Sequence, residues 1–292
     1  MAMDLHDLEV NLNKYSDHKI KINAITPMRG GDICNAYKIE GPSKLYFLKT
    51  HQPSMHNMLK CEAKSLSAIA NTNTIKVPQA IANGQTASYS FLLLEYLDLI
   101  DTGSHAALGM GLAKLHQHHE DYFGWDENNW IGTTTQPNDK NEDWLTFWCE
   151  MRIGHQIDLA KSNHAPHTLI QNCEKLLVDI SSLYEGYVPK PSLLHGDLWS
   201  GNFAFILGGT PVVYDPASYY GDRETDLAMT ELFGGFHQDF YSAYNEYYPI
   251  DIGYRVRKHF YNLYHILNHF NLFGGGYAAQ AERLCLKVLS EI

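Results

Sequence analysis

The chain has 292 residues, of which 45% are hydrophobic and 19% charged, and its formal net charge is −11 at pH 7. This length allows one or two domains with a substantial core. The acidic balance argues against a nucleic-acid-binding protein, which needs a basic face. It suits a cationic or amine-bearing ligand, and equally plain solubility. No apolar run approaches the roughly 20 residues that cross a bilayer, so no membrane segment is predicted.

The N-terminus and the cysteines together predict a cytoplasmic protein. Met1–Asp7 is acidic and lacks the basic and then apolar order of a signal peptide. The five cysteines are an odd number, widely spread, without a C-x-x-C pair. They indicate reduced thiols rather than a disulfide framework.

The first third of the chain is predicted to be mostly strand with one main helix. A leading helix is expected over residues 5–15, and alternating polar and apolar side chains predict a strand over Lys19–Asn23. Pro27 and Gly30–Gly31 predict a loop. Further elements are a helix over residues 57–70 and strands over residues 36–39, 45–49, 79–83 and 88–94. Together they predict an antiparallel-sheet lobe.

After Asp98 the pattern becomes helical. Ser104 is a plausible N-cap of the next helix, and Thr133–Asn141 is predicted to be a loop. Further helices are expected near residues 143–161, 167–184, 226–248 and 254–273, with a last one close to the C-terminus. The predicted fold is α+β and bilobal, as in protein kinases, with an N-terminal lobe over residues 1–97 and a C-terminal helical lobe over residues 98–292.

The segment Leu194–Asn202 carries the strongest functional signal. Asp197 and Asn202 are five positions apart in a stretch that two glycines interrupt, which predicts a short loop. The catalytic loop of protein kinases has the same interval between an aspartate, which accepts the proton of the attacking hydroxyl, and an asparagine, which holds magnesium. Asp215 follows a predicted strand 18 positions after Asp197, about where a second metal ligand belongs. His195 is expected to brace the loop through hydrogen bonds.

A nucleotide also needs a phosphate cradle and a cation, and a Walker A sequence is absent. Gly30 and Gly31 could form the cradle, although an ordinary turn is an equal interpretation. Lys49 ends an apolar strand, and Glu62 on the predicted helix could pair with it and direct its ammonium toward phosphates. Cys34 follows the glycines, so its oxidation could block the nucleotide.

The strand over residues 90–97 is predicted to lead into the hinge between the lobes. The backbone of Glu95 and Leu97, which flank Tyr96, is assigned to the adenine edge. For two other groups of residues, a functional and a structural interpretation both remain open. His116–His119 fits either a zinc site or, preferably, a helix end facing water, and the tryptophans, Trp199 among them, fit either sugar stacking or core packing.

Three acids open the helix that follows the catalytic segment. A solvated first turn is the simplest interpretation of Asp222 and Glu224, because the helix dipole favours acids there. Asp226 is instead expected to be buried and to accept hydrogen bonds from the backbone of the catalytic loop.

With these motifs, the chain resembles the fructosamine kinases, or ketosamine kinases, of the aminoglycoside-phosphotransferase-like superfamily. The resemblance covers nearly the whole chain. It is most specific in four segments, namely Phe123–Trp125, His195–Asn202, Asp215–Met229 and Leu267–Gly274. Trp199 after Asp-Leu separates this family from choline and aminoglycoside kinases.

The resemblance implies ATP- and Mg²⁺-dependent phosphorylation of a sugar hydroxyl, typically O3, on a small or protein-linked ketosamine, in deglycation repair. By carry-over, Asp197 is the proton acceptor, Asn202 and Asp215 are the metal ligands, and residues 95–97 form the adenine hinge. Separately, Trp199 and Asp222 are expected to support substrate or structure. A monomer or weak homodimer is expected. One departure is Cys34 with the asparagine after it, where the family has other residues.

Two alternatives remain. One is a kinase for another hydroxyl compound, such as an aminoglycoside, choline or a thio-sugar. The other is a nucleotide-binding pseudokinase. The joint presence of Lys49, Glu62, Asp197, Asn202 and Asp215 argues against the second alternative, since pseudokinases usually lose at least one such residue.

Overall fold

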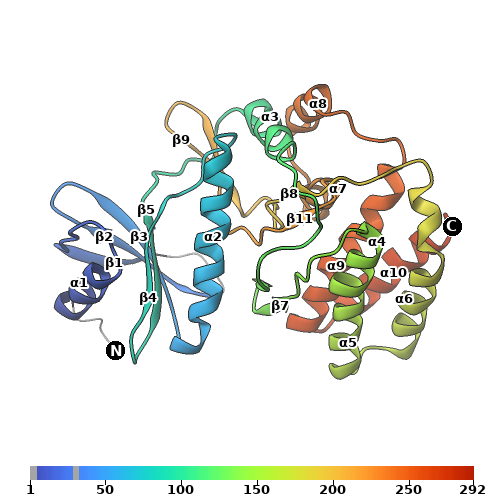
Figure 1. Cartoon of the computed structure of the whole chain (residues 1–292), viewed down its shortest axis with the longest axis horizontal. Coiled ribbons are helices and arrows are strands. Elements are labelled where there is room, and N and C mark those ends of the chain that lie inside the picture. Colours follow the sequence, from blue (N-terminus) through green and yellow to red (C-terminus); the bar gives the residue numbers. More distant parts are fainter. Residues whose placement is uncertain (1–4, 29–32) are drawn as a thin grey trace. The chain divides into compact units, whose positions relative to one another are not determined.

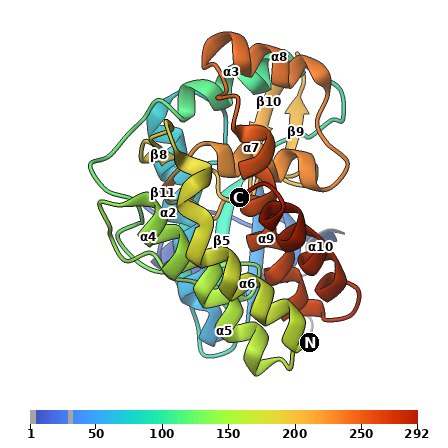
Figure 2. The same ribbon diagram turned by 90° about the vertical axis from the view of Figure 1, so that its right-hand side faces the viewer.

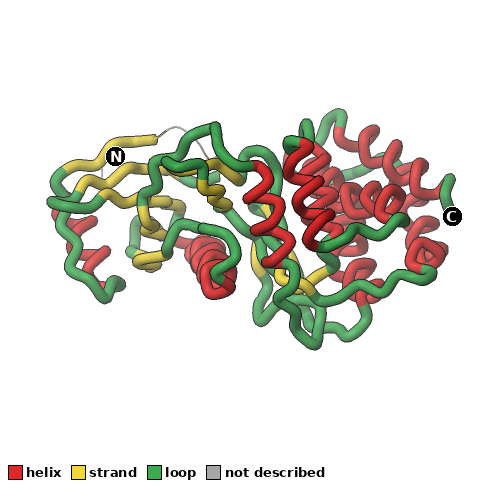
Figure 3. The backbone as a smooth tube through the Cα atoms, turned by 90° about the horizontal axis from the view of Figure 1, so that it is seen from above, coloured by secondary structure: helices red, strands yellow, loops and turns green. Residues whose placement is uncertain are grey.

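The computed structural model describes residues 5–28 and 33–292, which form two compact units. The first contains the described residues up to Ser104 together with Ala204–Pro216, and the second contains His105–Phe203 and Ala217–Ile292. Strands dominate the first unit and helices the second (Figure 3). The predicted α+β class is confirmed. The units divide the chain at other positions than the predicted lobes, which stay a prediction.

The first unit is built on a five-stranded antiparallel sheet with the order β1-β2-β3-β5-β4 (Figure 1). A helix before β1 and a longer one between β3 and β4 accompany the sheet, the longer one preceded by a short 3₁₀ turn. The bounds are α1 Leu5–Lys14, β1 Ala24–Met28, β2 Asn35–Glu40, β3 Leu45–His51, η1 Pro53–Met55, α2 His56–Thr72, β4 Ala80–Gln85 and β5 Ser90–Glu95.

Successive side chains of β3 point to opposite faces of the sheet, so neighbouring residues make contacts with different helices. Leu48 packs in a core with Leu8 and Leu12 of α1. The next residue, Lys49, reaches the other helix, α2, where it meets Glu62. The apolar pattern that buries Leu48 therefore also directs the Lys49 side chain.

The strand predicted over residues 19–23 is wrong, because a side chain of α1 forms hydrogen bonds with the backbone of this segment. The Ile20 N–H donates to Asn13 Oδ1 at 2.8 Å, and Asn13 Nδ2 returns a bond to the Ile20 carbonyl at 2.7 Å. The strand begins instead at Ala24. Pro27, predicted to lie in a loop, belongs to it, and its missing N–H is tolerated because β1 is an edge strand.

A later hairpin returns to the first unit and brings Asp215 with it. Ile100 and Phe205 exchange two backbone hydrogen bonds of 2.7 and 2.9 Å, and the Val213 N–H donates to the Lys76 carbonyl at 3.0 Å. These bonds attach a segment that follows the catalytic loop in sequence to the sheet-bearing unit. The hairpin consists of β9 Phe203–Ile206 and β10 Thr210–Val213.

The second unit is a helical assembly around α9, which packs against α5, α7 and α10 (Figure 2). Two short strand pairs accompany it, β6 with β7 and β8 with β11. The bounds are α3 His105–Leu115, β6 Asn129–Ile131, β7 Thr134–Gln136, α4 Trp144–Phe147, π-helical η2 Trp148–Gly154, α5 His155–Ser162, α6 His167–Asp179, η3 Ile180–Tyr184, β8 Ser192–Leu193, β11 Tyr220–Gly221, α7 Glu224–Leu232, α8 Gln238–Tyr247, α9 Tyr254–Phe273 and α10 Tyr277–Leu289.

Two predictions for this unit need correction. The polar stretch Thr133–Asn141 is not wholly a loop, because β7 pairs there with β6. The helix predicted over residues 226–248 is broken, because Gly234 and Gly235 have φ of +99° and +76°, which a helix does not allow. Among the described residues, no helix combines the length and apolar character that crossing a membrane requires.

Candidate active site

The catalytic loop follows β8 and turns sharply at a glycine. Gly196 has φ of +84°, and a Cβ built on it would lie 2.1 Å from the Ala217 carbonyl oxygen. Only glycine fits so close an approach. The Ala217 N–H donates to the His195 carbonyl at 2.9 Å, which ties this turn to the strand segment behind it. Asp197 follows this turn directly.

The structure brings Asp197 and Asn202 together. Asn202 Nδ2 donates to the Asp197 carbonyl oxygen at 2.8 Å and to Asp197 Oδ2 at 3.1 Å. Asn202 is buried and Asp197 is half-buried, so the amide orients a carboxylate on a partly exposed residue. An oriented and partly exposed carboxylate can hold and accept the proton of a hydroxyl group.

The Asp226 side chain holds the backbone of the catalytic loop in place. Its carboxylate is buried and accepts the N–H groups of His195 at 2.7 Å and Gly196 at 2.8 Å, and it lies 3.1 Å from His116 Nε2. The hydrogen bonds predicted from the loop backbone are present. Burial opposes ionisation, but the bonds from His116 and the loop outweigh it, and the pKa of Asp226 is lowered. The anion therefore holds both N–H groups.

His118 and His119 are exposed, as predicted for the histidines at this helix end, but the prediction is wrong for His116. It is buried, and its Nδ1 lies 2.8 Å from the Tyr244 hydroxyl. Burial lowers its pKa, so the ring is neutral, with Nε2–H donating to Asp226 and Nδ1 accepting from Tyr244. Within the described residues, no group of three His, Cys, Asp or Glu residues could hold a metal. Sequence missed this contact because both partners lie more than 100 positions away.

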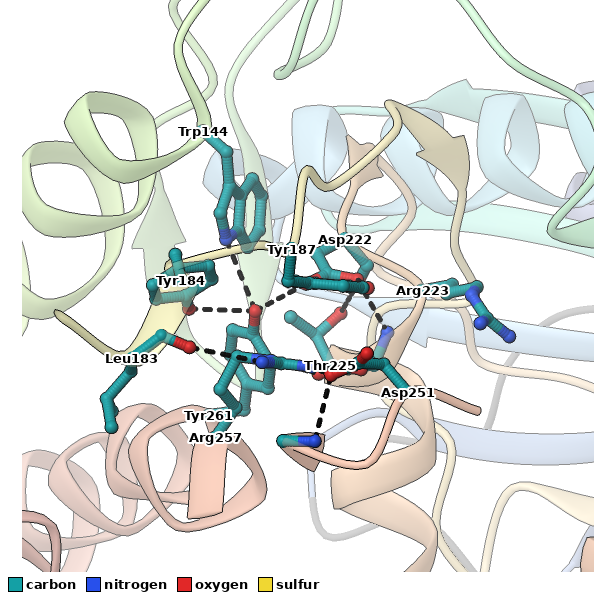
Figure 4. Close-up of polar contacts among 12 residues, drawn as sticks. Trp144, Leu183, Tyr184, Tyr187, Asp222, Arg223, Thr225, Asp251, Arg257 and Tyr261 are labelled. Carbon is teal, nitrogen blue, oxygen red and sulfur yellow. Dashed lines mark hydrogen bonds and ion pairs between the residues drawn. The ribbon is translucent and has the colours of Figure 1, made fainter. Parts of the chain in front are cut away.

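Asp222 and Glu224 are not a solvated turn, because both are buried. Asp222 accepts hydrogen bonds from the Tyr261 hydroxyl at 2.5 Å and the Tyr187 hydroxyl at 2.9 Å (Figure 4). Burial raises the pKa of Asp222 despite these donors. Its side chain is therefore a structural joint between the start of α7 and α9.

Arg257 of α9 completes this joint. Its Nε and a terminal nitrogen bind the two carboxylate oxygens of Glu224 at 2.8 and 2.9 Å, and the same terminal nitrogen reaches Asp251 at 2.6 Å. The guanidinium also lies 3.8 Å from the centre of the Tyr187 ring (Figure 4). A bidentate pair of this kind fixes orientation as well as charge. It sets α7 in place, and with it Asp226.

In the first unit, Lys49 lies between two carboxylates. Its Nζ is 2.7 Å from Glu62 Oε1 and 2.5 Å from Asp215 Oδ1. The predicted pair with Glu62 is present. Burial opposes the positive charge, but Asp215 and Glu62 outweigh it, and the pKa of Lys49 is raised. Lys49 is therefore a permanent cation, suited to phosphate oxygens.

Asp215 has an unusual backbone. Its φ is +58°, in the left-handed region that non-glycine residues adopt uncommonly, and which Asn73 and His164 also adopt in this chain. It follows β10, and its side chain is 44% exposed, so the carboxylate is open to a ligand as well as to Lys49. Its role as a metal ligand stays a prediction, to which the exposed carboxylate is suited.

The predicted phosphate loop is only partly visible. Gly30 and Gly31 lie outside the described residues. Cys34 does not have the character of a reactive thiol, because burial raises its pKa to about 11. Oxidation as a block on the nucleotide is therefore disfavoured by the protonated state of this thiol.

The predicted hinge has one backbone group already paired. The Glu95 N–H donates to the Gln79 carbonyl at 2.9 Å, and the Glu95 side chain lies 3.4 Å from Lys76 Nζ. Lys38 Nζ lies 5.4 Å from the centre of the Tyr96 ring. An adenine edge would therefore use the carbonyl oxygen of Glu95 rather than its N–H.

The comparisons with known proteins show the family of this chain. The family model described as fructosamine kinase matches residues 5–291. The chain belongs to this family. A probable ketoamine kinase of Synechocystis is 42% identical and covers 95% of each chain. The chloroplastic protein-ribulosamine 3-kinase of Arabidopsis thaliana is 37% identical, over 89% of this chain and 81% of that one.

Solved structures give the same result. A Haemophilus somnus protein assigned as a fructosamine-3-kinase is 31% identical, has a TM-score of 0.87 and covers 97% of this chain and 96% of its own. An ADP-bound aminoglycoside phosphotransferase has a TM-score of 0.65 at 13% identity over 98% and 99% of the chains, which shows the fold alone. The predicted kinase-like fold and ketosamine kinase family are therefore confirmed, as is a phosphotransferase with an alcohol acceptor.

Proposed function

We propose that this fructosamine kinase family member transfers the γ-phosphoryl group of ATP to the O3 hydroxyl of a ketosamine. The relatives named as ketoamine and ribulosamine 3-kinases support the substrate class. The observation that carries the proposal is the fixed pair of Asp197 and Asn202, which places a half-buried carboxylate beside an amide in the second unit.

Asp197 acts on the acceptor. Its carboxylate orients the sugar hydroxyl by accepting its hydrogen bond and takes the proton as the oxygen–phosphorus bond forms and the bond to the leaving ADP oxygen breaks. Phosphoryl transfer asks mainly for positioning and charge stabilisation, so a carboxylate of ordinary basicity suffices. The amide of Asn202 keeps this carboxylate in one orientation.

Lys49 acts on the donor. Its charge, fixed by Glu62, suits the α- and β-phosphates. Its second partner, Asp215, is one of the two residues proposed to bind the metal. For the adenine edge, we assign the carbonyl oxygen of Glu95 as acceptor and the N–H of Leu97 as donor, with Tyr96 between them. The bond from the Glu95 N–H to Gln79 is consistent with this choice.

The donor set also fits Mg²⁺. Asn202 offers an amide oxygen and Asp215 an exposed carboxylate, the hard oxygen ligands that this ion prefers. When bound, Mg²⁺ neutralises the phosphate charge. Of these two ligands, Asp215 belongs to the first unit and Asn202 to the second.

We further propose a cytoplasmic protein, a monomer or weak homodimer, that acts on ketosamines without binding nucleic acid or membranes. The net charge of −11 supports a substrate that carries an amine and disfavours polyanions. Trp199, which is 37% exposed two positions after Asp197, supports a sugar acceptor beside the loop.

A substrate panel tests the function. ADP formation is followed with a ribulosamine, a fructosamine, kanamycin and choline, each with and without Mg²⁺. We expect Mg²⁺-dependent turnover with at least one ketosamine only. Turnover with kanamycin or choline alone would favour another small-molecule kinase, and no turnover with any acceptor would favour a pseudokinase.

An Asp197→Asn variant assigns the base. We expect kcat to fall by at least about 10³-fold while ATP binding by calorimetry stays nearly unchanged. Asp158→Asn, an exposed acid of the same unit, is the matched control. Equal loss of turnover and of ATP binding would contradict the role of Asp197.

A further inference from the structure

A chain of aromatic rings leads away from the catalytic loop within the second unit. Successive centroids lie 6.2 Å apart from Trp199 to Phe233, 5.1 Å from Phe233 to His269, and 5.7 and 5.2 Å from His269 to Phe273 and Tyr277. These five residues are here called the outer aromatic strip. They come from the loop, the end of α7, the last turns of α9 and the start of α10.

The strip begins at the transfer centre. Trp199 follows Asp197 by two positions, and its indole covers Gly201, where a Cβ would lie 2.4 Å from the ring. Only a glycine lets the indole fold over the loop in this way. The ring therefore lies over Gly201, the residue that precedes Asn202.

The outer end of the strip is open. Phe273 is 64% exposed and Trp199 is 37% exposed. With the rings that connect them they form a contiguous aromatic surface, and exposed surfaces of this kind mark binding sites. Gly234 follows Phe233, and Gly274, Gly275 and Gly276 follow Phe273. A Cβ at any of these four glycines would meet no atom within 4 Å. The rim of the strip therefore leaves room for a bulky ligand.

Packing between α9 and α10 does not account for this arrangement. The two helices already bury apolar residues such as Phe270, Ala281 and Cys285. Phe273, with most of its surface in water, adds little to that core. Its exposed face is therefore available to a ligand.

We propose that the outer aromatic strip binds the amine-linked part of the ketosamine, up to and including a peptide that carries the modified lysine. This inference rests on the proposed function. The amine nitrogen is attached to C1 of the sugar, two carbons from C3. With O3 at Asp197, the nitrogen and its substituent must extend out of the transfer centre. Trp199 is the first ring on the way out, and Phe273 and Tyr277 are the last.

The chemistry of the strip matches such a ligand. A protonated secondary amine is attracted to the faces of aromatic rings, and its alkyl or peptide substituent gains contact with them. Open glycine rims on both sides accommodate a backbone. We therefore expect the strip to favour ketosamines with long or peptide-borne amines over those of small amines.

A comparison of two ribulosamine adducts tests the proposal. One carries methylamine and the other the side chain of a lysine in a short peptide, and kcat/KM is measured for both. For Phe273→Ala and Tyr277→Ala we expect the ratio of the peptide-borne to the small adduct to fall about ten-fold, the effect of one ring contact with a cation or its chain. Leu286→Ala, at a half-exposed position of α10, is the matched control and should leave the ratio unchanged.

A second variant separates ring recognition from packing. Phe273→Leu keeps an apolar side chain without an aromatic face, so the ratio should still fall, while Phe273→Tyr should retain it. An unchanged ratio in both alanine variants, or a fall matched by Leu286→Ala, would overturn the proposal. Absence of turnover with either adduct in the unmodified protein would instead overturn the proposed function.

Discussion

Replacing Asp226 by asparagine tests how the catalytic loop is held. The carboxylate accepts N–H groups from His195 and Gly196 at 2.7 and 2.8 Å and lies 3.1 Å from His116 Nε2. Asparagine keeps the shape, loses the charge and turns one acceptor oxygen into a donor. At least one buried N–H then loses its partner and faces another N–H.

The size of the effect follows from these contacts. A hydrogen bond to a charged group contributes about 1.5–3 kcal/mol, and a buried donor left unpaired costs a similar amount. We therefore expect Asp226→Asn to lower the free energy of unfolding by about 3–5 kcal/mol. Displacing the loop that carries Asp197 by about 1 Å should also reduce kcat about 10²-fold.

The assay is urea unfolding at pH 7 together with kcat for a ketosamine. Asp239→Asn, an exposed acid of α8, is the control and should change neither. The pKa of Asp226 is lowered in the folded protein. Its stabilisation is therefore present above the unfolded-state pKa near 3.9 and is lost as the pH falls through the lower folded pKa, so the variant should lack this acid dependence. Stability within about 0.5 kcal/mol of the unmodified protein would refute the reasoning.

Three further predictions follow from single contacts. Lys49→Met should reduce kcat/KM by about 10²–10³-fold, because it removes the phosphate cation, whereas Lys60→Met on the exposed face of α2 should have no effect in the same ADP assay. Gly196→Ala should destabilise the protein by about 3–5 kcal/mol in urea unfolding, because its Cβ meets a carbonyl oxygen. Gly208→Ala, also at positive φ but in open space, should cost about 1–2 kcal/mol, and equal costs would contradict the argument. Burial lowers the pKa of His265 to about 3 in the folded protein, whereas an unfolded histidine has a pKa near 6.5. A falling pH therefore protonates the unfolded state first, and the free energy of unfolding should decrease by about 1.4 kcal/mol between pH 7.5 and 5.5. His265→Phe should lose this part of the pH dependence.

Local motifs predicted two contacts of the candidate site because the elements that carry them are close in sequence. Asp197 and Asn202 share one loop, and the pairing of Lys49 with Glu62 follows from the order of strand and helix. The return of Asp215 to the first unit was not predictable, since it depends on backbone pairing over more than 100 positions.

The residues that support the site were predicted poorly, because their partners are distant in sequence. Asp222 and Glu224 have the composition of a solvated helix start, and their true partners, Tyr261 and Arg257, lie more than 30 positions away on α9. His116 likewise has distant partners. Charge and helical position favour water for such residues, whereas tertiary hydrogen bonds make their burial possible.

The central claim is that the chain phosphorylates O3 of a ketosamine. Phosphorus NMR of the product formed from ATP, Mg²⁺ and a lysine-linked ribulosamine tests it most directly. We predict one ADP for each ketosamine consumed and a phosphate attached to the C3 oxygen. ADP formed equally without the ketosamine, or a phosphate on another oxygen, would contradict the account.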